Sequence, residues 1–74
     1  MEKLDLHGMR HEFVKPTLIR FIEDRWRKDI EVEIITGNSP KMKTIVKDIL
    51  NEYKLEYLDG GFLGLKNAII TTTI

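Results

Sequence analysis

The most constraining feature of this sequence is the order in which two hydrophobic periodicities alternate along it. Residues 3–7 alternate in polarity, with Leu4 and Leu6 on one side, as in a half-buried strand. Residues 11–26 carry apolar side chains at helical spacing, and residues 31–36 are dense in β-branched residues, which favours a second strand. The first half of the chain therefore predicts a strand, a helix and a strand in succession.

A second helix is predicted to begin at Ser39 and Pro40, because serine is a preferred N-cap and proline fits the first helical position, where no donor is needed. Its apolar residues keep helical spacing as far as Tyr53. In the first helix, Pro16 removes a backbone donor, so we expect it either to mark the start of the regular helix, after an irregular first turn, or to kink it.

Two short strands are expected after the second helix, at residues 55–59 and 68–74, separated by a loop at residues 60–67 that contains three glycines. Strand–helix–strand connections of this length favour parallel neighbours with right-handed crossovers, whereas the last two strands should be antiparallel. We therefore predict an α/β fold, a two-layer β-α-β-α-β-β sandwich with a mixed sheet and both helices on one face. The predicted core consists of Leu4, Leu6, Val14, Leu18, Phe21, Ile22, Val32, Ile34, Met42, Ile45, Val46, Ile49 and Leu50.

A chain of 74 residues can close one hydrophobic core, so residues 1–74 are expected to form a single domain. The sequence contains no cysteine, which excludes both a disulfide framework and a thiolate zinc site. Hydrophobic packing must therefore supply the stability.

Charge and hydropathy limit the partners. Twelve basic residues balance twelve acidic ones, so any contact with nucleic acid must be local rather than driven by net charge. No stretch approaches the roughly 18 apolar residues of a membrane span, and the first residues contain no apolar signal core. We expect no membrane partner and a cytoplasmic location.

The best candidate for a ligand site lies at the carboxyl ends of the first two strands, because helix N-termini and free backbone amides converge there in open α/β sheets. The second strand is followed by Thr36, Gly37, Asn38 and Ser39. Glycine permits a tight turn, the next amides open a helix whose dipole favours anions, and serine adds a hydroxyl. From spacing alone, a strand terminator and a helix cap that bind nothing are the simpler interpretation of the same residues.

Asp5 and His7 lie at the end of the first strand, on the side opposite Leu4 and Leu6. A carboxylate beside an imidazole can orient its tautomer and raise its basicity, as a general base requires. His11 follows across a turn and could join them, and ligand type alone would also allow Asp5, His7 and His11 to bind a metal. Ordinary exposed polar side chains are the simpler alternative.

Basic residues follow both strand ends. Arg10 comes after the first strand, and Lys41 and Lys43 come after the second. These side chains could flank a bound phosphate backbone.

The chain resembles the Smr (small MutS-related) domain in its segments LDLHG (residues 4–8) and IITGNS (residues 34–39), each followed by a helix. That module occurs alone and at the C-terminus of a bacterial MutS paralogue, and we expect the stand-alone minimal form here. The resemblance covers nearly the whole chain. It implies a fold similar to the C-terminal domain of bacterial translation initiation factor 3, and a nicking or single-strand endonuclease activity on DNA or RNA.

Within this resemblance, Asp5 and His7 match the acidic and histidine positions of LDLHG, and Gly8 matches its glycine. Thr36 and Gly37 match the start of the family's TGxG turn.

Two departures alter this pattern. Ser39 stands where the family usually has a second glycine, and the late Gly-Gly-x-Gly segment is present only as Gly60 and Gly61, with Gly64 displaced. The first change affects the phosphate turn and the second affects the loop that should border it. Fold and binding should survive these changes better than catalysis.

The resulting hypothesis is an endonuclease in which His7 transfers a proton and Asp5 orients it, with Arg10 or Lys41 offsetting charge in the transition state. Residues expected to bind phosphate or nucleic acid are Gly8, Arg10, His11, Thr36, Gly37, Asn38, Ser39 and Lys41. No residue is assigned to a metal, although a divalent Mg or Mn cofactor is compatible with this chemistry. Two alternatives stay open: a non-catalytic nucleic-acid-binding module with the same pocket, and a small protein-interaction or regulatory domain.

The terminal strand at residues 68–74 is β-branched and uncharged. At the edge of a sheet such a strand invites pairing with another chain, so we expect either a homodimer through it or a protected edge.

Overall fold

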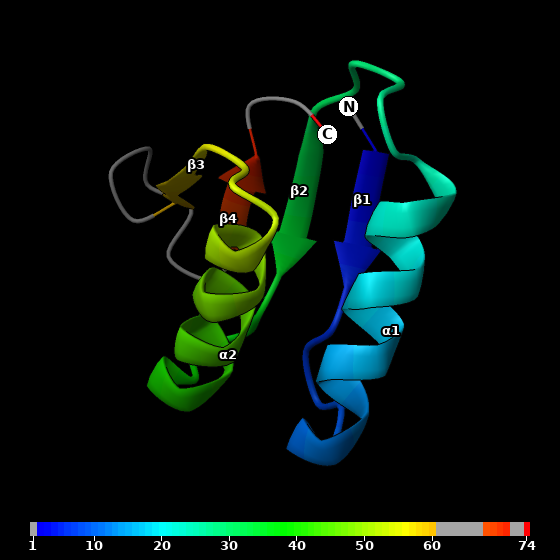
Figure 1. Ribbon diagram of the computed structural model, residues 1–74. Coiled ribbons are helices and arrows are strands. Elements are labelled where there is room, and N and C mark those ends of the chain that lie inside the picture. Colours follow the sequence, from blue (N-terminus) through cyan, green and yellow to red (C-terminus); the bar gives the residue numbers. More distant parts are fainter. Residues whose placement is uncertain (1, 61–67, 72–73) are drawn as a thin grey trace.

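The computed structural model describes residues 2–60, 68–71 and 74 of the chain. Within them lie two helices and four strands in the predicted order (Figure 1): β1 (Glu2–Asp5), α1 (His11–Asp24), β2 (Val32–Ile35), α2 (Pro40–Glu52), β3 (Tyr57–Asp59) and β4 (Ala68–Thr71). The α/β class and the order of elements are confirmed, although β1, β2 and β3 are shorter than predicted. Apart from Gly60, the predicted glycine loop, with Gly61 and Gly64, lies outside the described residues.

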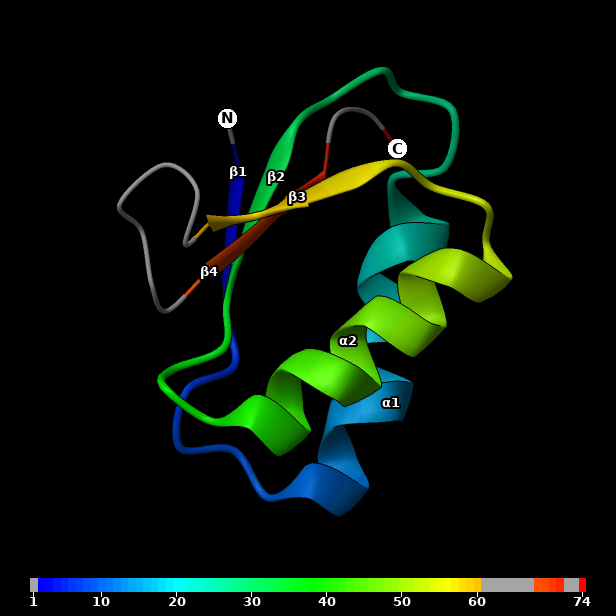
Figure 2. The same ribbon diagram turned by 90° about the vertical axis from the view of Figure 1, so that its left-hand side faces the viewer.

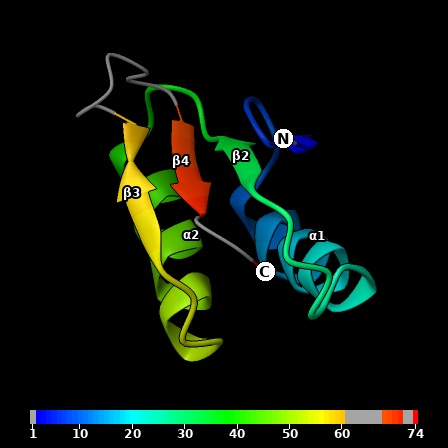
Figure 3. The ribbon, with the colours of Figure 1, turned by 90° about the horizontal axis from the view of Figure 1, so that it is seen from above.

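The four strands form one sheet in the order β1-β2-β4-β3. β1 and β2 are parallel, with Leu4 opposite Ile34, whereas β4 runs antiparallel to β2 on one side and to β3 on the other. Figure 3 shows β4 between its two neighbours. The predicted parallel first pair and antiparallel last pair are therefore confirmed.

The terminal strand does not lie at an edge of the sheet, where it would have invited pairing with another chain. β4 is an interior strand, so β2 and β3 are not neighbours, and the edges of the sheet are β1 and β3. Ile69 of β4 lies opposite Ile34 and is fully buried, whereas Leu58 of β3 is 51% exposed. Burial therefore favours the terminal strand at the centre of the sheet and the three-residue β3 at its edge. The expected homodimer through the C-terminal strand loses its basis, because both edges of β4 are paired within the chain.

Both helices cover the same face of the sheet, which gives two layers with the core between them (Figure 2). Most of the predicted core is buried, but Leu4, Phe21 and Ile45 are only partly buried. Ile69 and Ile74 belong to the core and were not predicted. Within the described residues, no helix is both long enough and apolar enough to cross a membrane.

α1 begins at His11 and continues through Pro16, so the proline does not mark its start. Its first turn contains a short-range hydrogen bond from the Phe13 N–H to the Arg10 carbonyl at 3.0 Å, an i→i−3 bond of the 3₁₀ type. The helix ends at Asp24, two residues before the predicted end. Trp26 lies beyond it and packs against Tyr53, with 5.5 Å between the ring centroids.

α2 has a defined cap at each end. The Ser39 hydroxyl accepts a hydrogen bond from the Met42 N–H at 3.2 Å, as predicted for an N-cap. At the other end the Leu55 N–H donates to the Leu50 carbonyl and the Lys54 N–H to the Asn51 carbonyl, both at 3.0 Å. This is the Schellman arrangement, which requires a residue in the left-handed region, here Lys54 with φ of 57°.

Candidate functional site

The carboxyl ends of β1 and β2 and the N-termini of both helices lie at the same end of the molecule (Figure 1, Figure 2). The parallel register places Asp5 opposite Ile35. A further hydrogen bond, from the Leu6 N–H to the Ile35 carbonyl at 2.8 Å, carries the pairing one residue beyond β1. The two turns that the sequence predicts as a site therefore start side by side.

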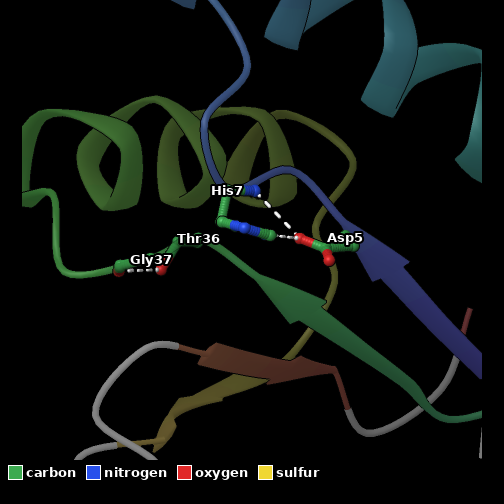
Figure 4. Close-up of polar contacts among 4 residues, drawn as sticks. All are labelled: Asp5, His7, Thr36 and Gly37. Carbon is green, nitrogen blue, oxygen red and sulfur yellow. Dashed lines mark hydrogen bonds and ion pairs between the residues drawn. The ribbon is translucent and has the colours of Figure 1, made fainter.

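Asp5 and His7 form a hydrogen-bonded pair (Figure 4). His7 Nδ1 lies 2.5 Å from Asp5 Oδ1, and the backbone N–H of His7 donates to the same oxygen at 3.0 Å. Because an ionised carboxylate only accepts, Nδ1 carries the proton and Nε2 is the acceptor of the neutral ring. Asp5 therefore selects the tautomer that a general base needs.

Asp5 is held in its ionised form by the same contacts. The hydrogen bond from the His7 ring, and then the one from the His7 backbone, lower the pKa of Asp5 below its ordinary value of 3.8, against the opposing effect of desolvation. The bond to the backbone N–H two residues later is an Asx-type turn, so Asp5 also shapes the chain locally. The sequence did not lead us to predict this second role, although an aspartate before a turn is its usual signal.

A tight turn holds His7 at the surface. The Met9 N–H donates to the Leu6 carbonyl at 3.0 Å, with His7 second and Gly8 third in the four-residue turn. Gly8 has φ of +77°, and a positive φ at the third position is the type II arrangement, which favours glycine. The His7 side chain is 65% exposed at the tip of this turn, so a ligand as large as nucleic acid can reach it.

Gly37 brings the second turn directly against His7. It has φ of +69°, and a Cβ placed on it would lie 3.3 Å from the His7 Cβ and 3.8 Å from the His7 Cα. A side chain at position 37 would therefore press on the histidine. The sequence predicted that His7 and Gly37 would lie close together, because their strands were expected to be parallel neighbours, and this contact confirms it.

The residues around Gly37 have different positions. The Thr36 side chain is buried, and its hydroxyl donates to the Gly37 carbonyl at 2.9 Å, so it supports the turn and does not reach a ligand at the surface (Figure 4). Asn38 is exposed. Ser39 is half-buried at the N-cap of α2. In this cap the Ser39 hydroxyl oxygen accepts a hydrogen bond through a lone pair, so the hydroxyl proton is still available to an outside acceptor.

The predicted flanking residues lie at the starts of the helices. Arg10 is the N-cap residue of α1 and forms an exposed ion pair with Glu12 at 3.5 Å, with 80% of the arginine side chain exposed. His11 begins α1, and Lys41 is exposed in the first turn of α2.

Lys43 differs from these residues. It lies 3.9 Å from Asp59 of β3, which also pairs with Lys47 at 3.0 Å, and only 19% of its side chain is exposed. Its charge therefore helps to connect α2 to β3.

The described part of the chain does not provide a metal cage. Among its residues no three His, Cys, Asp or Glu side chains are grouped to hold one ion, so the considered trio of Asp5, His7 and His11 is not assembled. Asp5 Oδ1 is already shared by two donors from His7. The side chains of the described residues therefore do not form a site for a resident metal.

A hollow of about 390 Å³ lies at the opposite end of β1, lined by Glu2, Asp24, Arg25, Lys28 and Ile30. Arg25 is committed there, because its Nε lies 3.0 Å from each Glu2 carboxylate oxygen and its guanidinium stacks 3.7 Å above the Phe21 ring. The carboxyl ends of β1 and β2 thus remain the better candidate.

One of three comparisons with known proteins gives a match. The family model described as "Smr domain" matches residues 4–59, which include both turns, both helices and β3. Searches of curated proteins and of solved structures gave no match to the chain. Since the matched segment contains well over half of the 74 residues, the chain belongs to the Smr domain family.

Proposed function

We propose that the chain is an Smr-type endonuclease that binds a backbone phosphate of DNA or RNA at the turn of residues 37–39 and uses His7 to transfer a proton. The observation that carries the proposal is the Asp5–His7 hydrogen bond, which lies against the Gly37 turn that leads into α2. Membership of a family that is generally nucleic-acid-binding and nuclease-related supports nucleic acid as the partner.

The phosphate would bind where three favourable features coincide. Gly37 has no side chain to block close approach, the N-terminus of α2 offers a favourable dipole, and Ser39 can donate its hydroxyl proton. Arg10 and Lys41 are exposed at the starts of the two helices and would offset negative charge as the reaction proceeds.

In the proposed reaction a water oxygen forms a bond to phosphorus while the bond from phosphorus to one ester oxygen breaks. The water proton moves to Nε2 of His7, and the resulting imidazolium has a proton to give to the departing oxygen. Asp5 contributes by keeping the ring in the correct tautomer and by stabilising the imidazolium.

A non-catalytic nucleic-acid-binding module is the second candidate, and two observations favour it. Ser39 replaces a glycine of the family turn, and its oxygen is engaged in capping α2. The Asp5 and His7 side chains are 52% and 65% exposed, so water screens a pair that most active sites shield.

Cutting and binding can be separated in one experiment. Labelled single-stranded, duplex and branched DNA and RNA would be incubated with the protein, with and without magnesium or manganese. We expect His7→Ala to abolish cleavage while folding and most of the binding are retained, because a general base acts on the reaction and not on the ground-state complex. If His7→Ala cuts as well as the wild type, the catalytic assignment is wrong. If the wild type binds but never cuts, the binding-module function replaces the endonuclease.

Ser39 allows a matched pair of variants that separates stability from binding. Ser39→Ala removes the cap and should cost about 1 kcal/mol of unfolding free energy. Ser39→Asp keeps an acceptor for the Met42 N–H, so it should fold as stably as the wild type, but its charge would repel phosphate. Thermal unfolding and oligonucleotide affinity, measured for both variants, test this. Undiminished affinity in Ser39→Asp would contradict a phosphate at this turn.

A further inference from the structure

Within the described part of the chain, the helices leave one face of the sheet uncovered. α1 and α2 both lie on the opposite face, against Ile34 and Ile69, which are fully buried (Figure 2). Successive residues of a strand alternate between the two faces, so the rows next to the Ile34–Ile69 row belong to the uncovered face. The register places in these rows Lys3, Glu33, Ile70 and Leu58, and Asp5, Ile35 and Ala68.

The uncovered face is apolar where β2, β4 and β3 lie side by side. Leu58 of β3 is 51% exposed, Ile35 of β2 is half-buried, and the register sets Ile70 of β4 opposite Leu58. A solvated sheet face normally carries polar residues, so these positions depart from the usual alternation. Neighbouring strands are about 4.8 Å apart, so β2 and β3 are separated by about 10 Å across β4, which is close to the diameter of an α-helix. One helix would therefore fit over this part of the face.

The charges that border the apolar positions are mostly acidic. Glu33 lies in the same row as Leu58, and the exposed Glu31 and Glu56 come directly before β2 and β3. Alternation assigns both of these glutamates to the uncovered face. Lys3, opposite Glu33, is the basic residue of these rows. The carboxylates repel the phosphates of a nucleic acid and the same face of a second copy, whereas they attract lysine and arginine side chains.

We propose that the uncovered face of the sheet binds a basic amphipathic helix of a partner protein. Apolar side chains of that helix pack on Leu58 and Ile35, and its lysine or arginine side chains lie beside Glu31, Glu33 and Glu56. α1 and α2 bury the apolar residues of the other face in the same way, so the partner helix adds a third layer. This inference concerns a protein partner and does not depend on the proposed nuclease or nucleic-acid binding.

Two synthetic peptides serve as probes. Each forms an amphipathic helix with leucines along one side, and the remaining positions are lysines in one peptide and glutamates in the other. The protein is labelled with nitrogen-15, and its backbone amide shifts are followed by NMR as each peptide is added. We expect the lysine peptide to shift the amides of Glu33, Ile35 and Leu58 until binding saturates. The glutamate peptide should leave them unchanged, because its charge matches that of the face.

Two variants, each with a matched control, test the apolar and the charged part of the face. Leu58→Ala should bind the lysine peptide roughly 10-fold more weakly, because about half of a leucine side chain is no longer buried on binding. Phe13→Ala, which removes an equally exposed side chain from α1, should bind like the wild type. Glu33→Gln should bind roughly 2- to 5-fold more weakly at low salt and with a smaller salt dependence. Glu52→Gln, at the end of α2, should show neither effect.

Thermal unfolding first establishes which variants are folded, and Glu33→Gln decides alone if Leu58→Ala is not. The inference is overturned if the lysine peptide does not bind, if the glutamate peptide binds equally well, or if a folded Leu58→Ala or Glu33→Gln binds like the wild type. Shifts at the same amides that depend on protein concentration would assign the face to a second copy, and shifts caused by a single-stranded oligonucleotide would assign it to nucleic acid. Either result also overturns the inference. Selective weakening in the two variants, with both controls unaffected, supports it.

Discussion

Replacing Gly37 by alanine tests the contact on which the candidate site depends. At φ of +69° an alanine is in the left-handed region, which costs roughly 1–2 kcal/mol for a residue with a Cβ. The new Cβ would also lie 3.3 Å from the Cβ of His7, so one of the two must move by a few tenths of an ångström. We therefore expect a loss of stability and, separately, a displaced His7.

Gly8→Ala is the matched control for the backbone. Gly8 has a similar φ of +77°, but no heavy atom lies within 4 Å of the position where its Cβ would be. Gly8→Ala should therefore show the energetic cost of a left-handed φ without any displacement of His7. For a domain of this size each 1 kcal/mol of lost stability lowers Tm by roughly 4–8 °C. The Tm of Gly8→Ala should therefore fall by about this amount or somewhat more, and the Tm of Gly37→Ala should fall further.

The assay combines thermal unfolding with NMR of the His7 ring, at a temperature where both variants are folded. In Gly37→Ala we expect changed His7 ring shifts and a loss of cleavage or binding larger than the loss of stability explains, because small displacements of a reacting group have large kinetic effects. The reasoning is refuted if the two variants lose equal stability and neither perturbs His7.

Two further predictions concern the end of α2 and the acid range. Lys54→Gly should raise the free energy of unfolding by roughly 0.5–1 kcal/mol, because glycine tolerates the left-handed φ at the Schellman position. The control Glu52→Gly, inside the helix, should lower the free energy of unfolding by about 1 kcal/mol. If urea unfolding shows that both variants are destabilised, the cap is contradicted. Since the pKa of Asp5 is lowered, its contribution to stability is complete above pH 3.8 and disappears as the pH falls through the folded-state value. Asp5→Asn should therefore reduce the slope of unfolding free energy against pH below 3.8 and leave the slope at higher pH unchanged. If the Asp5 carboxyl titrates by NMR with a midpoint at or above 3.8, its hydrogen bonds to His7 do not stabilise the ionised form.

The parts of the fold that were predicted correctly depend on local patterns. α2 was predicted almost to the residue, because Ser39 and Pro40 define its start and its apolar spacing is unbroken. The end of α1 was missed because Trp26 has helical spacing, while the chain leaves the helix at Arg25 and Arg27 takes φ of 61°. Periodicity does not report such a change of backbone conformation.

Strand order could not be predicted, because pairing joins segments far apart in the sequence. The short connection between the last two strands correctly indicated an antiparallel pair, but nothing local indicated that β4 would insert beside β2. The candidate site depended less on strand order. The Asp5–His7 pair follows from neighbouring residues, and the approach of Gly37 to His7 follows from the parallel pairing of β1 and β2, which the strand–helix–strand pattern predicted.

The interior position of β4 has a consequence for how the chain folds as it is synthesised. β3 leaves the ribosome before β4, and until β4 arrives β3 has no strand to pair with and Ile34 lacks its partner Ile69. Pairing over such a sequence separation requires closing a long loop, which slows folding. During that interval one edge of β2 is open to other chains, so the nascent protein is most prone to aggregation after α2 has formed and before β4 has docked.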